Sequence, residues 1–249
     1  MTNSLKALVR RTLSRLRLEV RRIPPVNGSV PDRRFYLPVF SPWLGYGDFD
    51  HFRRLAEPFT LVSPDRLYIL YVLALNALEL NGEFWECGVY KGGTARMLAE
   101  LIRLKGNSEG CTLRLFDTFA GMPQTSKQYD LHSRGDFSDT SLEAVRAIIG
   151  AADRVAFHPG LIPETFASRE NTSIAFSHID VDIYQSVRDC SEFIYHRLVA
   201  GGVMVFDDYG FPSCPGARKA VDEFFLDKPE TPIILPTGQA VVIKSRARP

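Results

Sequence analysis

Two pairs of carboxylates follow apolar runs of the sequence and are the residues best suited to carry out chemistry. Asp180 and Asp182 follow one such run, and Asp207 and Asp208 follow the run 202–206. Uninterrupted apolar runs are typical of parallel strands buried on both faces. In an open α/β sheet the carboxyl ends of the strands form the edge where ligands bind. We therefore expect all four acids at one ligand-binding edge.

Four carboxylates at one edge repel one another unless a cation lies between them. A hard divalent metal held by oxygen ligands is the simplest cation for such a site. The alternative is that these Asp residues cap the helices that follow, which Asp does well. Capping accounts for one acid per strand, whereas the sequence has a pair at each of two strands. The pattern favours a cation site.

A glycine-containing turn, residues 86–93, follows the first predicted strand. Glycine lets a backbone pass close to a ligand, and a helix N-terminus donates N–H groups. The glycine spacing does not match the G-x-G-x-x-G pattern that seats a pyrophosphate, and Glu86 would repel a diphosphate. A ligand with an ammonium group and no phosphate, such as S-adenosylmethionine, suits Glu86. Asp117 ends the next predicted strand, where such folds bind ribose hydroxyls. The alternative is a tight turn beside an ordinary surface acid.

The elements that must position these residues alternate regularly from residue 64 onward. Alternating strands and helices indicate βαβ units and a mostly parallel α/β sheet. The sequence predicts a hairpin at the C-terminal end, which would add an antiparallel strand, and a lid over the polar residues 120–139. We expect helices over 64–80, 95–104, 141–149, 184–198 and 217–225, and strands over 83–87, 112–116, 155–157, 174–179, 202–206, 232–235 and 240–243.

Composition restricts the class of protein. The chain has 249 residues, 45% hydrophobic and 24% charged, which are ordinary values for globular proteins. Residues 1–23 carry a net charge of +6, so the remainder carries −5 of the total of +1. A mildly acidic body argues against nucleic-acid binding. The four cysteines lack C-x-x-C spacing, which argues against a zinc site or a disulfide framework and indicates a cytoplasmic protein.

The basic N-terminal region, residues 1–34, is predicted to be a helical arm and linker, followed by one domain over 35–249. Apolar residues recur at helical spacing through 5–22, with arginines on the other faces. One interpretation is peripheral contact with an anionic membrane surface. The other is that the arm docks on its own domain or on a second subunit, and we expect a homo-oligomer.

Several blocks of the sequence resemble the macrocin O-methyltransferase family. The resemblance covers about residues 60–225 and is carried, in order, by residues 84–93, 116–123, 178–184, 201–209 and 215–224. It implies a Rossmann-like class I methyltransferase sheet, mostly parallel with an antiparallel C-terminal strand and helices on both faces. It also implies S-adenosylmethionine-dependent, Mg²⁺-assisted methylation of a sugar hydroxyl in a glycoside, glycan or secondary metabolite.

The resemblance assigns roles to individual residues. The implied Mg²⁺ ligands are Asp180, Asp207 and Asp208. The implied contacts to S-adenosylmethionine are Ser63, Glu86, Gly88, Asp117 and Gly160. Because the hydroxyl must lose its proton, Asp180 is the expected catalytic base, with Asp182 and His178 as less favoured candidates. The competing hypotheses are an NAD(P)-dependent oxidoreductase on a Rossmann sheet and a non-catalytic interaction module that keeps the fold.

Overall fold

The structure is a computed structural model that describes residues 41–106, 111–150 and 153–246. The chain divides into residues 1–40 and a compact unit of residues 41–249. The predicted arm and linker, including the membrane-contacting stretch 5–22, lie outside the described residues. Within the described part, no helix is both long and apolar enough to cross a membrane.

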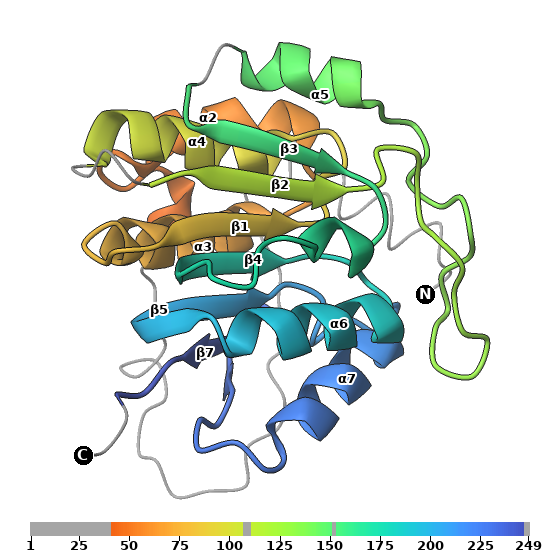
Figure 1. The fold of residues 1–249 in the computed structure, drawn as a ribbon. Coiled ribbons are helices and arrows are strands. Elements are labelled where there is room, and N and C mark those ends of the chain that lie inside the picture. The colour runs from red at the N-terminus through yellow and green to blue at the C-terminus, as the bar shows by residue number, and fades with distance from the viewer. Residues whose placement is uncertain (1–40, 107–110, 151–152, 247–249) are drawn as a thin grey trace, which may run out of the picture. The chain divides into compact units, whose positions relative to one another are not determined.

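A seven-stranded sheet in the order β3-β2-β1-β4-β5-β7-β6 forms the centre of the described unit (Figure 1). Strands β1 to β5 pair in parallel, whereas β7 runs antiparallel to both β5 and β6. The prediction of a mostly parallel sheet with an antiparallel C-terminal strand is therefore confirmed. The strands are β1 (Glu83–Cys87), β2 (Leu113–Asp117), β3 (Val155–Pro159), β4 (Ile174–Ile179), β5 (Leu198–Phe206), β6 (Ile233–Ile234) and β7 (Ala240–Ile243).

Helices cover both faces of the sheet. Figure 1 shows α6 and α7 in front of the strands and α2, α3 and α4 behind them. The α-helices are α2 (Phe49–Ala56), α3 (Pro64–Ala77), α4 (Gly93–Lys105), α5 (Leu142–Ile149), α6 (Tyr184–Tyr195) and α7 (Pro215–Phe225). Three short 3₁₀ helices accompany them in the described residues: η2 (Pro42–Leu44), η3 (Glu57–Phe59) and η4 (Glu164–Phe166).

The structure differs most from the predicted elements in three places. The sequence analysis missed α2, whose buried residues Phe49, Phe52 and Ala56 form a narrow stripe among charged neighbours. Strand β5 begins four residues before its predicted start at 202, because Gly201 continues it with a φ of +84° and donates its N–H to Lys244. Helix α6 ends three residues before its predicted end at 198.

Side chains alternate across the sheet and fill two separate cores. Phe84 and Phe176 pack behind the sheet against α2, α3 and α4, whereas Trp85 and Phe206 pack in front against α6 and α7. Near the carboxyl ends of the central strands this apolar pattern is interrupted by fully buried polar residues: Glu86, Ser177, His178 and Asp207. Burying such groups without partners is costly, so their contacts define the site described below.

A buried carboxylate fixes the C-terminal end of the described chain. Glu230 accepts hydrogen bonds from the Tyr195 hydroxyl and from the backbone N–H and hydroxyl of Ser245. Lys244 Nζ lies 3.7 Å from the same carboxylate. Burial would raise the pKa of Glu230, but the hydrogen bonds from Ser245 and Tyr195 lower it to about 2. The ionised form therefore stabilises the folded chain.

We predict that Glu230→Gln loses on the order of 2 kcal/mol of stability at pH 7. Because the folded pKa of about 2 lies below the ordinary value of 4.5, this stabilisation is present above pH 4.5. This stabilisation is lost as the pH falls from 4.5 to about 2. Melting temperatures measured from pH 7 to pH 3 should converge for the wild type and Glu230→Gln. The exposed Glu164→Gln serves as control and should follow the wild type at every pH.

Candidate active site

A cavity of about 280 Å³ opens at the carboxyl ends of the central strands. Six of the residues predicted from the sequence to form the site line it: Gly88, Asp117, Gly160, Asp180, Asp182 and Asp208. Three others, Ser63, Glu86 and Asp207, do not line it. Five strands contribute, because Gly88 and Gly160 follow β1 and β3, Asp117 ends β2, and the remaining three acids follow β4 and β5.

Gly88 brings the ends of β1 and β4 together. Its φ is +84°, and a Cβ at this position would lie 1.8 Å from the Asp180 carbonyl oxygen. The backbone N–H of Asp180 donates to the Cys87 carbonyl at 2.8 Å. Only glycine permits this approach. The glycine turn is therefore the element that places Asp180 beside the carboxyl end of β1.

Asp117 organises the same turn from the neighbouring strand. Its carboxylate accepts the backbone N–H groups of Val89 at 2.6 Å, Tyr90 at 3.0 Å and Phe119 at 2.6 Å. The Thr118 hydroxyl lies 3.5 Å from Oδ1 but donates at 2.6 Å to the Gly121 carbonyl. An ionised carboxylate has about four acceptor positions, so Asp117 has capacity beyond its three backbone bonds. Asp117 also lines the cavity. It can therefore order the turn and still accept a hydroxyl of a bound ligand.

Glu86 lies behind the cavity wall. It is fully buried, and its Oε1 accepts from the hydroxyl of Thr94, which itself lines the cavity. The same oxygen lies 3.0 Å from Nδ1 of His178. The other oxygen, Oε2, has no hydrogen-bonding partner among the described residues. An unpaired buried carboxylate oxygen beside the cavity suits a cationic group or an ordered water molecule.

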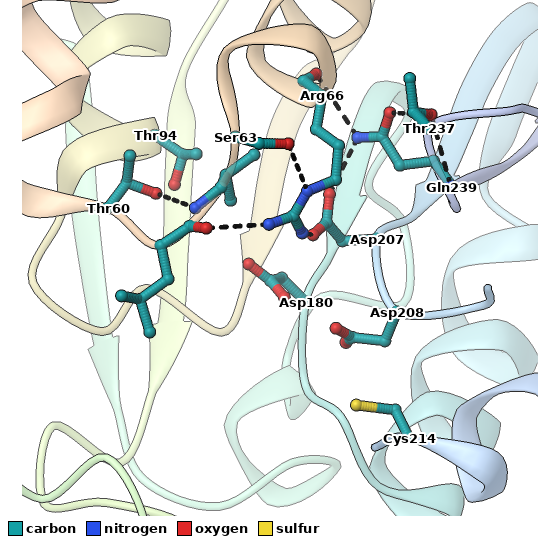
Figure 2. A network of polar contacts seen from close by, with 12 residues as sticks. Thr60, Ser63, Arg66, Thr94, Asp180, Asp207, Asp208, Cys214, Thr237 and Gln239 are labelled. Carbon is teal, nitrogen blue, oxygen red and sulfur yellow. Dashed lines mark hydrogen bonds and ion pairs between the residues drawn. The ribbon is translucent and has the colours of Figure 1, made fainter. Parts of the chain in front are cut away.

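Asp207 is the most enclosed of the four acids. Its side chain is 0% exposed and pairs with the Arg66 guanidinium, and Gln239 Nε2 donates to Oδ1 at 2.8 Å (Figure 2). His178 Nε2 lies 3.6 Å from the same oxygen. Burial would raise the pKa of Asp207, but His178 and Arg66 together bring that pKa below its ordinary value. Asp207 is thus held ionised by cationic neighbours.

Arg66 was missed by the sequence analysis, because it is one of many arginines and no local motif distinguishes it. Its Nη2 donates to the Leu61 carbonyl at 2.8 Å, and its Nε donates to the Ser63 hydroxyl at 3.2 Å. The guanidinium also lies over the Phe211 ring, 4.8 Å from its centroid. Ser63 therefore contacts the arginine that faces the cavity, and does not line the cavity itself.

Asp180 and Asp208 present their side chains to the cavity (Figure 2). Burial is the main cause that raises the pKa of both carboxyls well above the ordinary value, and the nearby acids add to it: chiefly Asp207 for Asp180, and Asp180 for Asp208. Neither residue caps a helix. Helix α6 has Ile183 and α7 has Cys214 at the N-cap, without a side-chain cap in either case, and Asp130 accepts the N–H of Tyr184 at 2.8 Å. The capping alternative is therefore wrong.

The oxygen donors of this cluster fit a hard divalent cation such as Mg²⁺. Asp180 and Asp208 offer carboxylate oxygens directly to the cavity. Asp207 could serve as a third ligand only through lone pairs that Arg66 and Gln239 leave unused. A cation between Asp180 and Asp208 would relieve the repulsion that raises their pKa values.

Asp182 points to another part of the cavity wall. It adopts a left-handed conformation, with a φ of +57°, and its N–H donates to Asp208 Oδ2 at 3.0 Å. Its Oδ1 lies 3.4 Å from the Cys214 thiol and 3.7 Å from Nε2 of His132. Both neighbours line the cavity, and the sequence analysis assigned a site role to neither.

The segment 120–139, which was predicted to be a lid, is attached to the rest of the fold at the N-terminus of α6. Asp130 accepts from the N–H groups of Ser126 and Tyr184, each at 2.8 Å. Gly216 leaves room for this carboxylate, because a Cβ there would lie 2.2 Å from Asp130 Oδ1. The attachment places His132 at the cavity.

Comparison with known proteins places the chain in a family. A family model described as Macrocin-O-methyltransferase (TylF) matches residues 57–234. The chain belongs to this family. The matched range includes all the residues that line the cavity, and the resemblance inferred from the sequence is confirmed.

Curated relatives in the family are named for their acceptors. The 8-demethyl-8-(2,3-dimethoxy-alpha-L-rhamnosyl)-tetracenomycin-C 4'-O-methyltransferase of Streptomyces olivaceus is 29% identical over 154 residues, covering 57% of this chain and 58% of that protein. The mycinamicin III 3''-O-methyltransferase of Micromonospora griseorubida is 29% identical over 180 residues, covering 66% and 69%. The chain thus spans less than two thirds of the first relative's length.

Solved structures confirm the class I methyltransferase fold. The O-methyltransferase NovP superposes with a TM-score of 0.67 at 24% identity, over 76% of this chain and 83% of that chain. An O-methyltransferase from Bacillus cereus in complex with SAH superposes with a TM-score of 0.54 at 17% identity, over 82% and 94%.

We predict that Arg66→Met destabilises the protein by about 3 kcal/mol, because it leaves the buried Asp207 carboxylate without its guanidinium partner. Urea unfolding would measure the loss. Arg103→Met is the matched control, since Arg103 is 65% exposed and, among the described residues, forms an ion pair only with Glu100 one helical turn away. It should change stability by less than about 0.5 kcal/mol. Adding Asp207→Asn to Arg66→Met should recover part of the loss. Equal stability of the two arginine variants would contradict the assignment.

Proposed function

We propose that this chain is an S-adenosylmethionine-dependent O-methyltransferase that methylates a sugar hydroxyl with the assistance of Mg²⁺. The observation that carries the proposal is the meeting, in one cavity, of the glycine turn and Asp117 with the acids Asp180 and Asp208. Membership of the macrocin O-methyltransferase family supports it. The glycine turn and Asp117 suit a nucleoside. Asp180 and Asp208 suit a cation and an ionisable hydroxyl.

The methyl donor would bind at the ends of β1 to β3. Asp117 would accept the ribose hydroxyls, and the turn at Gly88 would let the backbone approach the ligand. Gly160 lines the same cavity after β3. Glu86, with its unpaired Oε2, would supply negative charge behind Thr94 for the ammonium group. Ser63 would act indirectly, through its contact with Arg66.

The acceptor would bind at the ends of β4 and β5. Asp180 and Asp208, with Asp207 behind them, would hold Mg²⁺. The bound cation would act as a Lewis acid that lowers the pKa of the sugar hydroxyl and fixes its orientation. Arg66 keeps Asp207 ionised and in place.

Asp180 is the residue best placed to take the hydroxyl proton. In the reaction an oxygen–methyl bond forms, the sulfur–methyl bond breaks, and the hydroxyl proton passes to a base. Asp180 faces the cavity, with a side chain 26% exposed, whereas His178 is fully buried. Asp182 is the second candidate for this role.

The acceptor is proposed to be a sugar because relatives are named for a rhamnosyl-tetracenomycin and for mycinamicin III. A solved neighbour is described as a TDP-rhamnose 3'-O-methyltransferase. Apolar residues on the cavity wall, including Met122, Phe137 and Phe211, would contact the carbon faces of a glycoside. A soluble glycoside, a glycan precursor or a secondary metabolite would all satisfy this chemistry. Cytoplasmic location, a homo-oligomer and membrane contact through residues 5–22 remain part of the proposal.

We predict that S-adenosylhomocysteine stabilises the protein against heat and that NAD does not. At a ligand concentration of about 100 times the dissociation constant, binding to the folded state adds about 2.7 kcal/mol. Thermal melting with each ligand tests this. Asp117→Asn should reduce the shift, whereas Asp153→Asn, which changes an exposed acid in a distant loop, should not. A shift with NAD alone would favour the oxidoreductase hypothesis.

We predict that Asp180→Asn lowers the rate of methyl transfer by at least about 100-fold, because it removes the base. Asp208→Asn should raise the Mg²⁺ concentration needed for activity. The assay would follow transfer from S-adenosylmethionine to nucleotide-linked and lipid-linked sugars, with and without EDTA. Both variants should keep the melting shift with S-adenosylhomocysteine, and Asp189→Asn in α6 should resemble the wild type. Full activity of both variants would show that neither acid takes part in methyl transfer and would contradict this prediction.

A further inference from the structure

A second group of possible cation ligands lies on the cavity wall, separate from the cluster of Asp180, Asp207 and Asp208. It consists of His132, Asp182 and Cys214, which come from the segment 120–139, the loop after β4 and the N-cap of α7. All three line the cavity. The proposed methyl transfer does not require His132 or Cys214. The donor set of imidazole, carboxylate and thiol differs from the all-oxygen set of the first cluster.

The three atoms are spaced as the ligands of a tetrahedral metal would be, although the Cys214 thiol is also within hydrogen-bonding range of Asp182 and His132. Nε2 of His132 lies 3.7 Å from both Asp182 Oδ1 and Cys214 Sγ, and Oδ1 lies 3.4 Å from Sγ. A nitrogen–oxygen separation of 3.7 Å is too long for a normal hydrogen bond. Ligand atoms around a tetrahedral zinc ion lie about 3.3–3.6 Å apart, given bond lengths of about 2.0–2.3 Å. The three atoms need to move by only a few tenths of an ångström.

The surroundings of His132 also suit a metal ligand. Its other ring nitrogen, Nδ1, lies 3.1 Å from Asp136 Oδ2, which also accepts the N–H of Ser133 at 3.0 Å. A carboxylate on the far nitrogen of a metal-bound imidazole fixes its tautomer and increases its basicity. This arrangement leaves the Nε2 lone pair directed at Asp182 and Cys214. Asp136 is therefore a positioning residue for the cluster.

We propose that His132, Asp182 and Cys214 bind a transition-metal dication such as Zn²⁺ at a second site in the cavity. Thiolate and imidazole ligands select such ions over Mg²⁺, so the two sites would take different metals. Three protein ligands leave a fourth position facing the cavity, which a water molecule or an acceptor oxygen could occupy. Asp182 would then be a metal ligand and not a base. The inference rests on this geometry and is independent of the proposed methyl transfer.

The test is a Co²⁺ titration of the full-length chain, stripped with chelator, kept reduced and supplied with excess Mg²⁺ to saturate oxygen-only sites. We expect one Co²⁺ per chain, with a thiolate-to-cobalt charge-transfer band in the near ultraviolet and displacement by Zn²⁺. Cys214→Ser should lose the band, and His132→Asn should bind at least about 10-fold more weakly. Asp136→Asn should weaken binding by about 10-fold or more.

Two control variants distinguish this site from binding at another cysteine and from binding at the first cluster of acids. Cys111→Ser changes another buried cysteine, just before β2, and should keep the band. Asp180→Asn should also keep it, even if methyl transfer is lost, so the two proposals fail independently. Absence of the band in the wild type, or an equal band in Cys214→Ser, would overturn the second site. Melting curves of each variant would show that it is folded.

Discussion

The balance of charge around Asp207 is the interaction on which the site depends. This carboxylate is fully buried at the end of β5, where an unpaired charge would be strongly destabilising. Arg66 from α3, Gln239 from the loop before β7 and His178 from β4 surround it. Three elements distant in sequence are therefore tied to one strand end. This network fixes the geometry of the cavity before any ligand binds.

The same network continues into the cavity wall at the ends of β1 to β3, where we propose that the methyl donor binds. His178 joins Asp207 to Glu86, and Glu86 joins Thr94 at the cavity surface. Burial would lower the pKa of His178, but the carboxylates of Asp207 and Glu86 raise it well above its ordinary value. His178, buried between the two carboxylates, links the ends of β5, β4 and β1. It gives a physical reason why both halves of the cavity are held in a fixed relation.

Much of the fold followed from the sequence because its signals are local. Apolar runs, helical periodicity and turn residues located most of the strands and helices that the structure describes, and the hairpin signal correctly placed an antiparallel strand at the sheet end. Helix α2 was missed because only three of its residues are buried and charged residues surround them. Packing against elements distant in sequence buries these three residues and stabilises the helix. The i, i+3, i+7 spacing of these residues is itself a helical pattern, but it extends over only eight residues.

The sequence by itself determined that acids stand at the ends of two central strands and that a glycine turn follows β1, because strand ends and turns are properties of short segments. The tertiary structure alone decided how those acids are used. It turned Asp207 toward Arg66, left Asp180 and Asp208 facing the cavity, and turned Asp182 toward His132 and Cys214. The absence of C-x-x-C spacing could not predict the group of His132, Asp182 and Cys214, since such spacing records only neighbours along the chain. Packing brings together side chains separated by tens of residues, and no local pattern encodes that proximity.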